Sequence, residues 1–581
     1  MNTPSAKGAS PITHHSSLII PLLALGGGSL LAAWIGAVPL LDADEPRFAE
    51  CSRQMLVTGD WMYPQFNGRP RHAKPPLSNW VQATLYRLGG VNEITARLPS
   101  VIATVATGLL VCWFAGMWRG RGTGVMALAT WFALPQTHFW AKMSVVDPLL
   151  TLLISAALVT AFCGVEASGG ARWNWYLPCG LAMGLATMAK GPVGLVVPTF
   201  AYVLYVLLSK QVRKGLWHPG PWVALLIALA VAGPWFYAQI AYYGQSYIKT
   251  FIMGHNVERY ARARDSLGPI GWLWPIPVVM VFAFPAAILL PRGVGDAFRG
   301  LRRAWAGEAE AKWRLFAAIW LLSVALLFAP CATRLPQYFM ALYPAAALLA
   351  ADLLARLLLG EAGGGRRWPV ALGYLVVGLS LGGGFGYGAT TAADWAPKLH
   401  LDNVPLMSAV AGTMAAAFAL GGIVCAATWV WGKARTATVG LLAMGLLTAV
   451  AMSDVVWPMV GITRDQGLKE AGLICRQGLA PDAPVVTYRL HTSTIAFYSR
   501  RLYLEVEKRQ PEIAMALLRA HPGAWLLTHQ RYLPDLPGAE LEVIAARRQY
   551  VLARPRLAEA TRHPEAPSRG EPGTEQRNDQ R

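Results

Sequence analysis

The segment "SLIIPLLALGGGSLLAAWIGAVPLLDADEPRF", residues 17–48, joins a long apolar run to a cluster of acids. The run from Leu18 to Leu40 has about the 20 residues that an α-helix needs to cross a bilayer. Directly after it, Asp42, Asp44 and Glu45 fall within four positions. The segment therefore predicts a membrane span whose end carries carboxylates, and these are costly near lipid unless they pair, cap a helix or react.

The rest of the chain is similarly apolar. Of its 581 residues 54% are hydrophobic and 14% are charged, and the mean hydropathy is +0.37. These values favour a polytopic α-helical membrane protein over a soluble one, with about 13 transmembrane helices. The predicted spans are Leu18–Leu40, Ile94–Trp113, Val146–Cys163, Pro221–Ile240, Leu335–Leu359, Met407–Trp431 and Val439–Val456, with shorter or interrupted runs near 122–138, 175–192, 193–209, 271–291, 313–330 and 368–388.

The net charge is +19, and the basic residues are distributed along the chain in a pattern that indicates membrane topology. Basic residues concentrate in every second short loop: Arg119 and Arg121, Lys210, Arg213 and Lys214, Arg299, Arg302 and Arg303, Arg366 and Arg367, and Lys433 and Arg435. This positive-inside pattern predicts a cytoplasmic N-terminus, so the loop at 41–92 and the C-terminus face outward. A surface that binds a polyanion is the alternative explanation of the charge.

Three regions are predicted along the chain. Residues 1–460 form the transmembrane body, 461–552 alternate strand-like and helical runs as a small outward α/β domain does, and 553–581 have the composition of a disordered tail. The first apolar run is expected to be a retained anchor, since no small-residue cleavage site follows it. The seven cysteines form no C-x-x-C pair and are expected to be buried thiols rather than a disulfide or metal cluster.

The long outward loop predicts two amphipathic helices on the membrane surface. After Pro46, the apolar residues Phe48, Cys51 and Met55 recur at helical spacing. After Pro75 and Pro76 the same spacing recurs at Leu77, Val81, Leu85 and Leu88. A helix of this kind lies in the interface with its apolar face toward lipid.

The acids have both structural and chemical interpretations. Asp44 or Glu45 could cap the helix that begins near Pro46, with Glu45 the preferred cap, but capping does not require all three carboxylates. A surplus acid at this place can act as a general base or stabilise positive charge on a sugar ring. Asp147, beside Pro148, either caps its own helix or faces the same cavity as Asp44.

Several cations are expected on the outward side, where positive-inside placement disfavours them. They are Arg47, Lys74, Lys190, Arg259 and Arg334. They either anchor lipid headgroups or bind the phosphate of a lipid carrier. Tyr338 also has two interpretations, as a functional residue or as one of the interfacial tyrosines that are common in membrane proteins.

Several motifs now form one ordered set. "DADEPRFAECSRQMLVTGDWMYPQFNGRPRHAKPPLSNWVQA" and "GVNEITARLPS" are followed by "MAKGPVGLVVP", "AGPWFY", "GHNVERY" and "TRLPQYFMALYPAAALL". Over about residues 35–350 this set resembles the polyprenyl-phosphate-dependent glycosyltransferases of the GT-C fold. The resemblance is strongest to the aminoarabinose (lipid A) transferases of the ArnT type, which are related to the protein O-mannosyltransferases.

The resemblance implies roles for individual residues. Asp44 matches the acid at the catalytic centre, and Asp147 matches a second cavity acid. Positions that hold the carrier phosphate match Arg47, Lys74, Arg259, Tyr338 and, more weakly, Lys190. ArnT-type transferases commonly have an acid before the "KPP" lysine and a His pair that together can hold a metal. Here Ala73 and Gly254–His255 stand at those positions, with His72 nearby. No cofactor is therefore assigned, and the binding of a divalent metal is kept as an alternative.

The resemblance implies a glycosyltransferase of the bacterial inner membrane, with its C-terminal domain in the periplasm. It would move a sugar, 4-amino-4-deoxy-L-arabinose being one candidate, from undecaprenyl phosphate to lipid A or another envelope acceptor. Nucleic acid is not an expected partner. The alternatives are a protein or glycan glycosyltransferase of the same fold, a polytopic transporter of lipid-linked sugars and, less suited to the outward charges, a membrane scaffold.

Overall fold

The computed structural model describes residues 16–258, 271, 273–331, 335–360, 367–396 and 403–556. The chain forms two compact units, residues 1–478 with 492–502, and residues 479–491 with 503–581. The first unit extends beyond the predicted limit of 460 because the last apolar helix continues without a break from Ala434 to Gly478. Most of the predicted tail lies outside the described residues, and its first residues complete strand β7.

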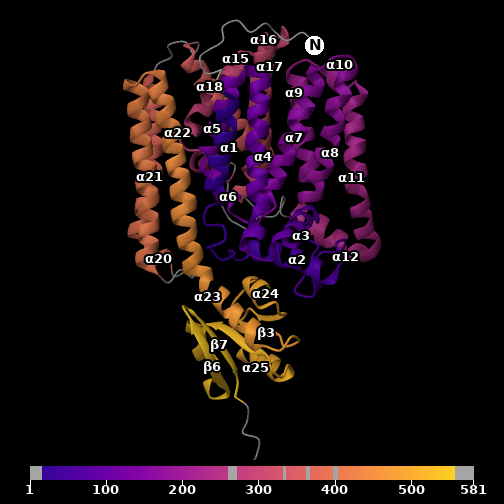
Figure 1. Cartoon of the computed structure of the whole chain (residues 1–581), viewed down its shortest axis with the longest axis vertical. Coiled ribbons are helices and arrows are strands. Elements are labelled where there is room, and N and C mark those ends of the chain that lie inside the picture. The colour runs from indigo at the N-terminus through magenta and orange to yellow at the C-terminus, as the bar shows by residue number, and fades with distance from the viewer. Residues whose placement is uncertain are drawn as a thin grey trace, which may run out of the picture. The chain divides into compact units, whose positions relative to one another are not determined.

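The first unit is a bundle of membrane helices, as the hydropathy predicts. Within the described residues, eight helical segments are long and apolar enough to cross a membrane (Figure 1). The predicted total of about 13 spans stays a prediction. The eight are α4 (Glu93–Arg119), α7 (Asp147–Glu166), α11 (Pro219–Tyr243), α17 (Ala309–Phe328), η6 with α18 (Pro336–Leu342 and Tyr343–Leu358), α19 (Arg367–Thr390), α21 (Val404–Trp431), and α22 with η8 and α23 (Ala434–Val450, Ala451–Val456 and Trp457–Gly478).

Shorter or broken helices occupy the remaining predicted spans. They are α1 (Ser16–Ala32), α5 (Arg121–Phe132), α6 (Pro135–Ala141), α8 (Trp173–Lys190), α9 (Val193–Leu208), α14 (Pro275–Phe282), η5 (Ala286–Leu289) and α15 (Leu290–Arg299). The run predicted at 271–291 is divided because Pro285 and Pro291 lack the N–H that a continuous helix needs. Connections contain η2 (Gly169–Arg172), α10 (Val212–Gly215), α12 (Gln245–Tyr247), η3 (Ile248–Val257), α16 (Leu301–Trp305) and α20 (Ala392–Trp395).

Small residues allow the helices to approach closely. A Cβ added to Gly378 of α19 would lie 2.6 Å from the Cα atom of Gly422 in α21. A Cβ at Gly180 of α8 would lie 2.5 Å from the carbonyl oxygen of Ala224 in α11. Small residues serve helix contacts in membranes, where lipid tails remove the hydrophobic drive for association. These pairs therefore fix two of the closest helix contacts in the bundle.

A buried ion cluster ties helix ends together. Asp352 of α18 is 2% exposed and accepts hydrogen bonds from the Nε atoms of three arginines. The distances are 2.7 Å from Arg119, 2.9 Å from Arg314 and 2.9 Å from Arg356. Arg119 ends α4 and Arg314 lies on α17, so one carboxylate joins three helices.

The long loop between α1 and α4 contains the two predicted helices, α2 (Asp44–Thr58) and α3 (Leu77–Gly89), with a short hairpin of β1 (Gln65–Phe66) and β2 (Arg69–Pro70). The helix predicted after Pro46 is confirmed, but its apolar residues Phe48, Cys51 and Met55 are buried against the protein and do not face lipid. Helix α3 instead buries Asn79, Gln82, Ala83 and Tyr86 against the protein. Of its predicted apolar face, Leu77, Val81 and Leu85 are half-buried, and only Leu88 is exposed, at 80%.

The second unit is built on a five-stranded sheet in the order β4-β3-β5-β7-β6. Strand β3 pairs in parallel with β4 and β5, whereas β7 is antiparallel to β5 and β6. The predicted α/β character is therefore confirmed. The elements are β3 (Val485–Tyr488), β4 (Tyr503–Val506), α25 (Pro511–Ala520), β5 (Trp525–His529), η9 (Gln530–Asp535), η10 (Gly538–Glu540), β6 (Leu541–Arg547) and β7 (Tyr550–Pro555), and α24 (Thr494–Ser499) belongs to the first unit.

Candidate functional site

A cavity of about 390 Å³ in the first unit brings most of the predicted site residues together. Its wall contains Asp44, Arg47, Lys74, Asp147, Lys190 and Tyr338. These residues come from α2, the turn before α3, the start of α7, the end of α8 and η6. Arg259 and Arg334 lie outside the described residues. The wall also contains Asp42, Arg71, Gln337 and Arg464, which were not predicted as site residues.

Asp44 has an exposed side chain on the cavity wall. It is the first residue of α2, whose N-cap is Ala43 with no side-chain cap. Among the residues that the structure describes, none forms a hydrogen bond or ion pair with its carboxylate. Asp44 therefore presents a negative charge to whatever enters the cavity.

Glu45 corrects the expectation that it caps α2. Its side chain is fully buried and accepts hydrogen bonds from the backbone N–H groups of Leu41 and Ser144, at 2.7 and 2.5 Å. Arg97 of α4 donates to its two carboxylate oxygens at 2.9 and 2.8 Å. The Arg97 guanidinium also donates to the carbonyl oxygens of residues 35, 38 and 39, so all of its N–H groups have acceptors. This buried pair fixes the segment that holds Asp44.

Asp42 binds a segment from far along the chain. Its Oδ1 atom accepts hydrogen bonds from the backbone N–H of Ser493, at 2.7 Å, and from the hydroxyl of Thr494, at 3.3 Å. Arg47 donates from Nε to the Ser493 hydroxyl at 2.8 Å. Ser493 immediately precedes α24. Residues 492–502 therefore hold both an acid and a cation of the loop between α1 and α4 in place.

Asp147 and Lys190 form an ion pair on the cavity wall. Asp147 begins α7 but its side chain makes no cap hydrogen bond, so the capping alternative is wrong. Lys190 is the last residue of α8, and its Nζ atom lies 5.0 Å from the centre of the Tyr338 ring. The pair places a cation and an aromatic ring beside each other at one part of the wall.

A second cavity of about 90 Å³ shares part of this wall. The two cavities have Lys74, Asp147, Lys190, Gln337 and Tyr338 in common. The other residues of the second cavity are mostly apolar, among them Leu150, Ile154, Val193, Val197 and Phe328. The combined space suits an amphiphile that has a charged head and an apolar chain.

The described residues near Lys74 do not fit the metal that the resemblance describes. Ala73 has no ligand atom, and the His72 ring packs edge-on against Tyr243 and Tyr247 at centroid distances of 4.5 and 5.4 Å. Burial lowers the pKa of His72. The side chain of His255 lies outside the described residues.

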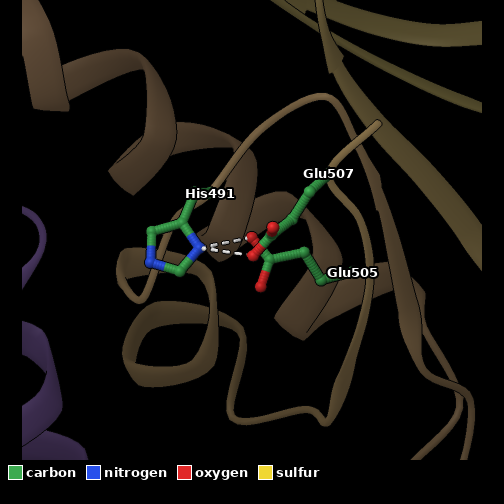
Figure 2. Close-up of side chains that lie close together, drawn as sticks. All are labelled: His491, Glu505 and Glu507. Carbon is green, nitrogen blue, oxygen red and sulfur yellow. Dashed lines mark hydrogen bonds and ion pairs between the residues drawn. The ribbon is translucent and has the colours of Figure 1, made fainter. Parts of the chain in front are cut away.

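Within the described part of the chain, one group of three potential metal ligands occurs, and it lies in the second unit. Figure 2 shows the His491 ring facing the carboxylates of Glu505 and Glu507. The Nδ1 atom lies 2.6 Å from Glu505 and 3.6 Å from Glu507. Because these partly exposed groups already contact one another and are not part of the cavity wall, they do not supply the expected metal site.

Two cavity cations were missed for different reasons. Arg71 lies three positions before Lys74 in the same outward loop, so the argument from positive-inside placement applied to it as well. Arg464 lies on α23, in sequence that was assigned to the outward domain. No local pattern indicates that α23 reaches the cavity.

Comparisons with known proteins agree with this architecture. A model of the dolichyl-phosphate-mannose-protein mannosyltransferase family matches residues 73–237. The undecaprenyl phosphate-alpha-4-amino-4-deoxy-L-arabinose arabinosyl transferase of Edwardsiella ictaluri is 28% identical over 506 residues, which are 85% of this chain and 88% of that protein.

Solved structures extend the likeness to the fold. The crystal structure of ArnT from Cupriavidus metallidurans bound to undecaprenyl phosphate superposes with a TM-score of 0.73 at 22% identity, over 92% of this chain and 97% of that one. The archaeal oligosaccharyltransferase AglB from Archaeoglobus fulgidus superposes with a TM-score of 0.52 at 11% identity, over 90% of this chain and 70% of that one. By sequence and fold together, this chain is similar to the ArnT-type glycosyltransferases of the GT-C fold, which are related to the protein O-mannosyltransferases.

Proposed function

We propose that the protein moves 4-amino-4-deoxy-L-arabinose from undecaprenyl phosphate to lipid A. The observation that carries the proposal is the joined pair of cavities, where a charged wall meets an apolar one at Lys74, Asp147, Lys190, Gln337 and Tyr338. A polyprenyl-phosphate sugar has the matching division between a charged head and an apolar chain. The sugar and carrier in the names of the related transferases support this choice.

The cations act on the leaving group. A phosphate is a weak base, so its departure from the sugar requires stabilisation of negative charge rather than a general acid. Lys74 and Lys190 line both cavities and bind the donor phosphate, together with Arg47 and Arg259. Asp147 orients the Lys190 ammonium through their ion pair, and the Tyr338 hydroxyl supplies a further hydrogen bond to the phosphate.

The transfer is a single exchange at the anomeric carbon. An oxygen of the acceptor forms a bond to this carbon while the bond to the donor phosphate breaks, and the phosphate leaves with the electron pair. An acceptor phosphate is already anionic and needs no deprotonation, so Asp44 stabilises the positive charge that develops on the sugar ring. For an acceptor hydroxyl, the same carboxylate takes the proton.

The protein is a multi-pass membrane protein, and we place the reaction on the periplasmic face of a bacterial inner membrane. The alternation of basic loops supports a cytoplasmic N-terminus. With an odd number of spans, the cavity loop and the second unit then face the periplasm. A reporter enzyme that is active only in the periplasm should therefore be active when it is fused after residue 556.

The direct test is Asp44→Asn in proteoliposomes supplied with labelled donor and lipid A. Loss of the carboxylate should lower kcat by roughly 10²–10⁴-fold, the usual contribution of one positioned acid or base. Asp60→Asn is the matched control, because Asp60 lies in the same loop and is not on the cavity wall, and its carboxylate accepts hydrogen bonds from the nearby backbone N–H groups of Met62 and Tyr63. Undiminished transfer by Asp44→Asn would remove Asp44 from the chemistry.

Two further measurements test the reaction class and acceptor. Mass spectrometry of lipid A from cells with and without the protein should show the added mass of the sugar only when the protein is present. Labelled donor that crosses the bilayer without any transfer to an acceptor would instead identify a transporter.

A further inference from the structure

The cations of the cavity differ in how their charges are neutralised. Lys190 pairs with Asp147, and Arg464 pairs with Asp465 at 2.9 Å. Arg71 lines the same cavity, and no carboxylate among the described residues forms an ion pair with it. The resemblance to the transferase family gives Arg71 no role. Its positive charge is therefore available to a ligand.

The protein holds Arg71 in a defined place. Its backbone N–H donates to the carbonyl oxygen of Pro64 at 2.8 Å, which extends the hairpin of β1 and β2. Its guanidinium carbon lies 4.3 Å from the centre of the Phe48 ring. Stacking on an aromatic face fixes the plane of a guanidinium and leaves its edge to bind an anion through two N–H groups.

One nitrogen of this guanidinium lacks an acceptor. The Nη1 atom of Arg71 is buried and makes no hydrogen bond in the structure. The side chain also lies beside the Cys51 thiol, whose pKa is raised by burial despite the opposing charge of Arg71. A buried donor without an acceptor is energetically unfavourable. An anion that binds Arg71 neutralises a charge which the protein itself leaves uncompensated.

The two cavities indicate which substrate supplies the anion. Lys74, Lys190 and Tyr338 line both, so the donor phosphate, which is joined to an apolar chain, belongs at the shared wall. Arg71 lines only the polar cavity, as do Asp44, Phe48 and the proposed donor ligand Arg47. A ligand group at Arg71 thus lies on the same cavity wall as the proposed catalytic carboxylate and outside the wall shared with the apolar cavity.

We propose that Arg71 binds a phosphate of the acceptor glycolipid and thereby selects anionic acceptors. This inference rests on the proposed transferase function and adds a residue and a ligand group to it. Arg71 transfers no proton; it holds the acceptor so that one of its oxygens can reach the anomeric carbon of the donor.

The test uses the full-length protein in proteoliposomes with undecaprenyl-phosphate aminoarabinose as donor. Bisphosphorylated lipid A and enzymatically dephosphorylated lipid A serve as acceptors. Arg71→Gln should raise the KM for phosphorylated lipid A by roughly 10- to 100-fold, as loss of a charge-assisted bidentate contact predicts. The KM for the donor should be unchanged, and Arg71→Lys should restore part of the acceptor affinity because it restores the charge.

Arg69→Gln is the matched control, since Arg69 is exposed on the same hairpin and does not line the cavity. A raised donor KM in Arg71→Gln would assign Arg71 to the donor and overturn the proposal. An equal loss with both acceptors, or a lowered melting temperature that accounts for the loss, would show a structural role and also overturn it.

A binding measurement separates this inference from the proposed function. Native mass spectrometry without donor should show weaker binding of phosphorylated lipid A to Arg71→Gln than to the wild type. If the wild type transfers sugar but both proteins bind the lipid equally, only the role of Arg71 fails. If the wild type transfers sugar to neither acceptor, the proposed reaction itself fails, and equal lipid binding by the two proteins would then reject the Arg71 site as well.

Discussion

Two neighbouring acids have opposite environments. Asp44 is exposed to the cavity without a protein partner among the described residues, whereas Glu45 is fully buried against Arg97. Desolvation makes the buried pair dependent on complete hydrogen bonding, which the guanidinium achieves by donating to two carboxylate oxygens and three carbonyl oxygens. Glu45 is therefore a structural residue that positions Asp44, the proposed catalytic acid.

This difference predicts opposite mutant phenotypes. Glu45→Ala leaves a buried guanidinium without its counter-charge and should lower the free energy of unfolding by about 3–5 kcal/mol. Asp44→Asn should leave stability unchanged while activity is lost. Thermal and denaturant unfolding of the purified proteins in detergent measures the first effect. Similar stabilities for Glu45→Ala and the wild type would contradict the structural role.

The sequence predicted the acid cluster but not the different roles of the acids within it. An acid just before Pro46 is a reasonable helix cap, because Pro is common in the first turn. The structure differs because the partner of Glu45, Arg97, lies 52 positions along the chain. Local patterns carry no information about such a contact, and only the resemblance distinguished Asp44 from Asp42 and Glu45.

At the scale of elements, α24 completes the site although it follows the last membrane helix. Asp42 accepts the backbone N–H of Ser493, and Ser493 accepts a hydrogen bond from Arg47. The hydroxyl of Tyr498 in α24 also accepts a hydrogen bond from the backbone N–H of Leu40, at 2.9 Å. The segment thus supports the loop between α1 and α4 on both sides of Asp44.

Removal of the Ser493 hydroxyl tests this support. Ser493→Ala deletes the acceptor of Arg47 and keeps the backbone N–H that binds Asp42, so a loss of roughly 3- to 10-fold in donor affinity is expected. Ser499→Ala is the control, because the Ser499 hydroxyl donates within α24 to Ile495 and does not contact Arg47. The donor KM should rise only in the first variant; a change confined to kcat would argue against positioning of Arg47 for phosphate binding.

Periodicity identified some elements and missed others for a physical reason. The apolar spacing in α2 and α3 was visible because each repeats over several turns. Helix α24 has only six residues, and its importance comes from hydrogen bonds to the outward loop rather than from its own pattern. The span at 271–291 was identified by composition, while its division into α14, η5 and α15 depends on how its prolines interrupt the helix.

At the scale of the whole molecule, ion pairs as well as close packing hold the helix bundle together. Asp352 and its three arginines join α4, α17 and α18, and none of these residues lines the cavity. Hydropathy predicted the spans that these helices form, since each needs an apolar run of membrane length. It could not predict the ion cluster, which exists only because three helix segments distant in sequence meet.

The cluster should affect stability without affecting the chemistry. Asp352→Ala leaves three guanidinium groups without their shared acceptor and should lower stability by about 3–5 kcal/mol, with a lower melting temperature. The kcat per folded molecule should remain that of the wild type at a temperature where both are folded. Wild-type stability would show that Glu310, the other acid paired with Arg119 and Arg314, compensates for the loss.

The contact between Asp42 and α24 also imposes an order on biosynthesis. Arg47 emerges from the ribosome 446 residues before Ser493, its hydrogen-bond partner. The first loop can therefore leave the membrane early, but its acid-bearing turn reaches its final geometry only after every membrane helix has been made. A nascent chain released before residue 492 would contain Asp44, Lys74, Asp147 and Lys190, yet the loop that carries Asp44 would lack its contacts with Ser493. Maturation of the site is thus coupled to nearly complete synthesis of the protein.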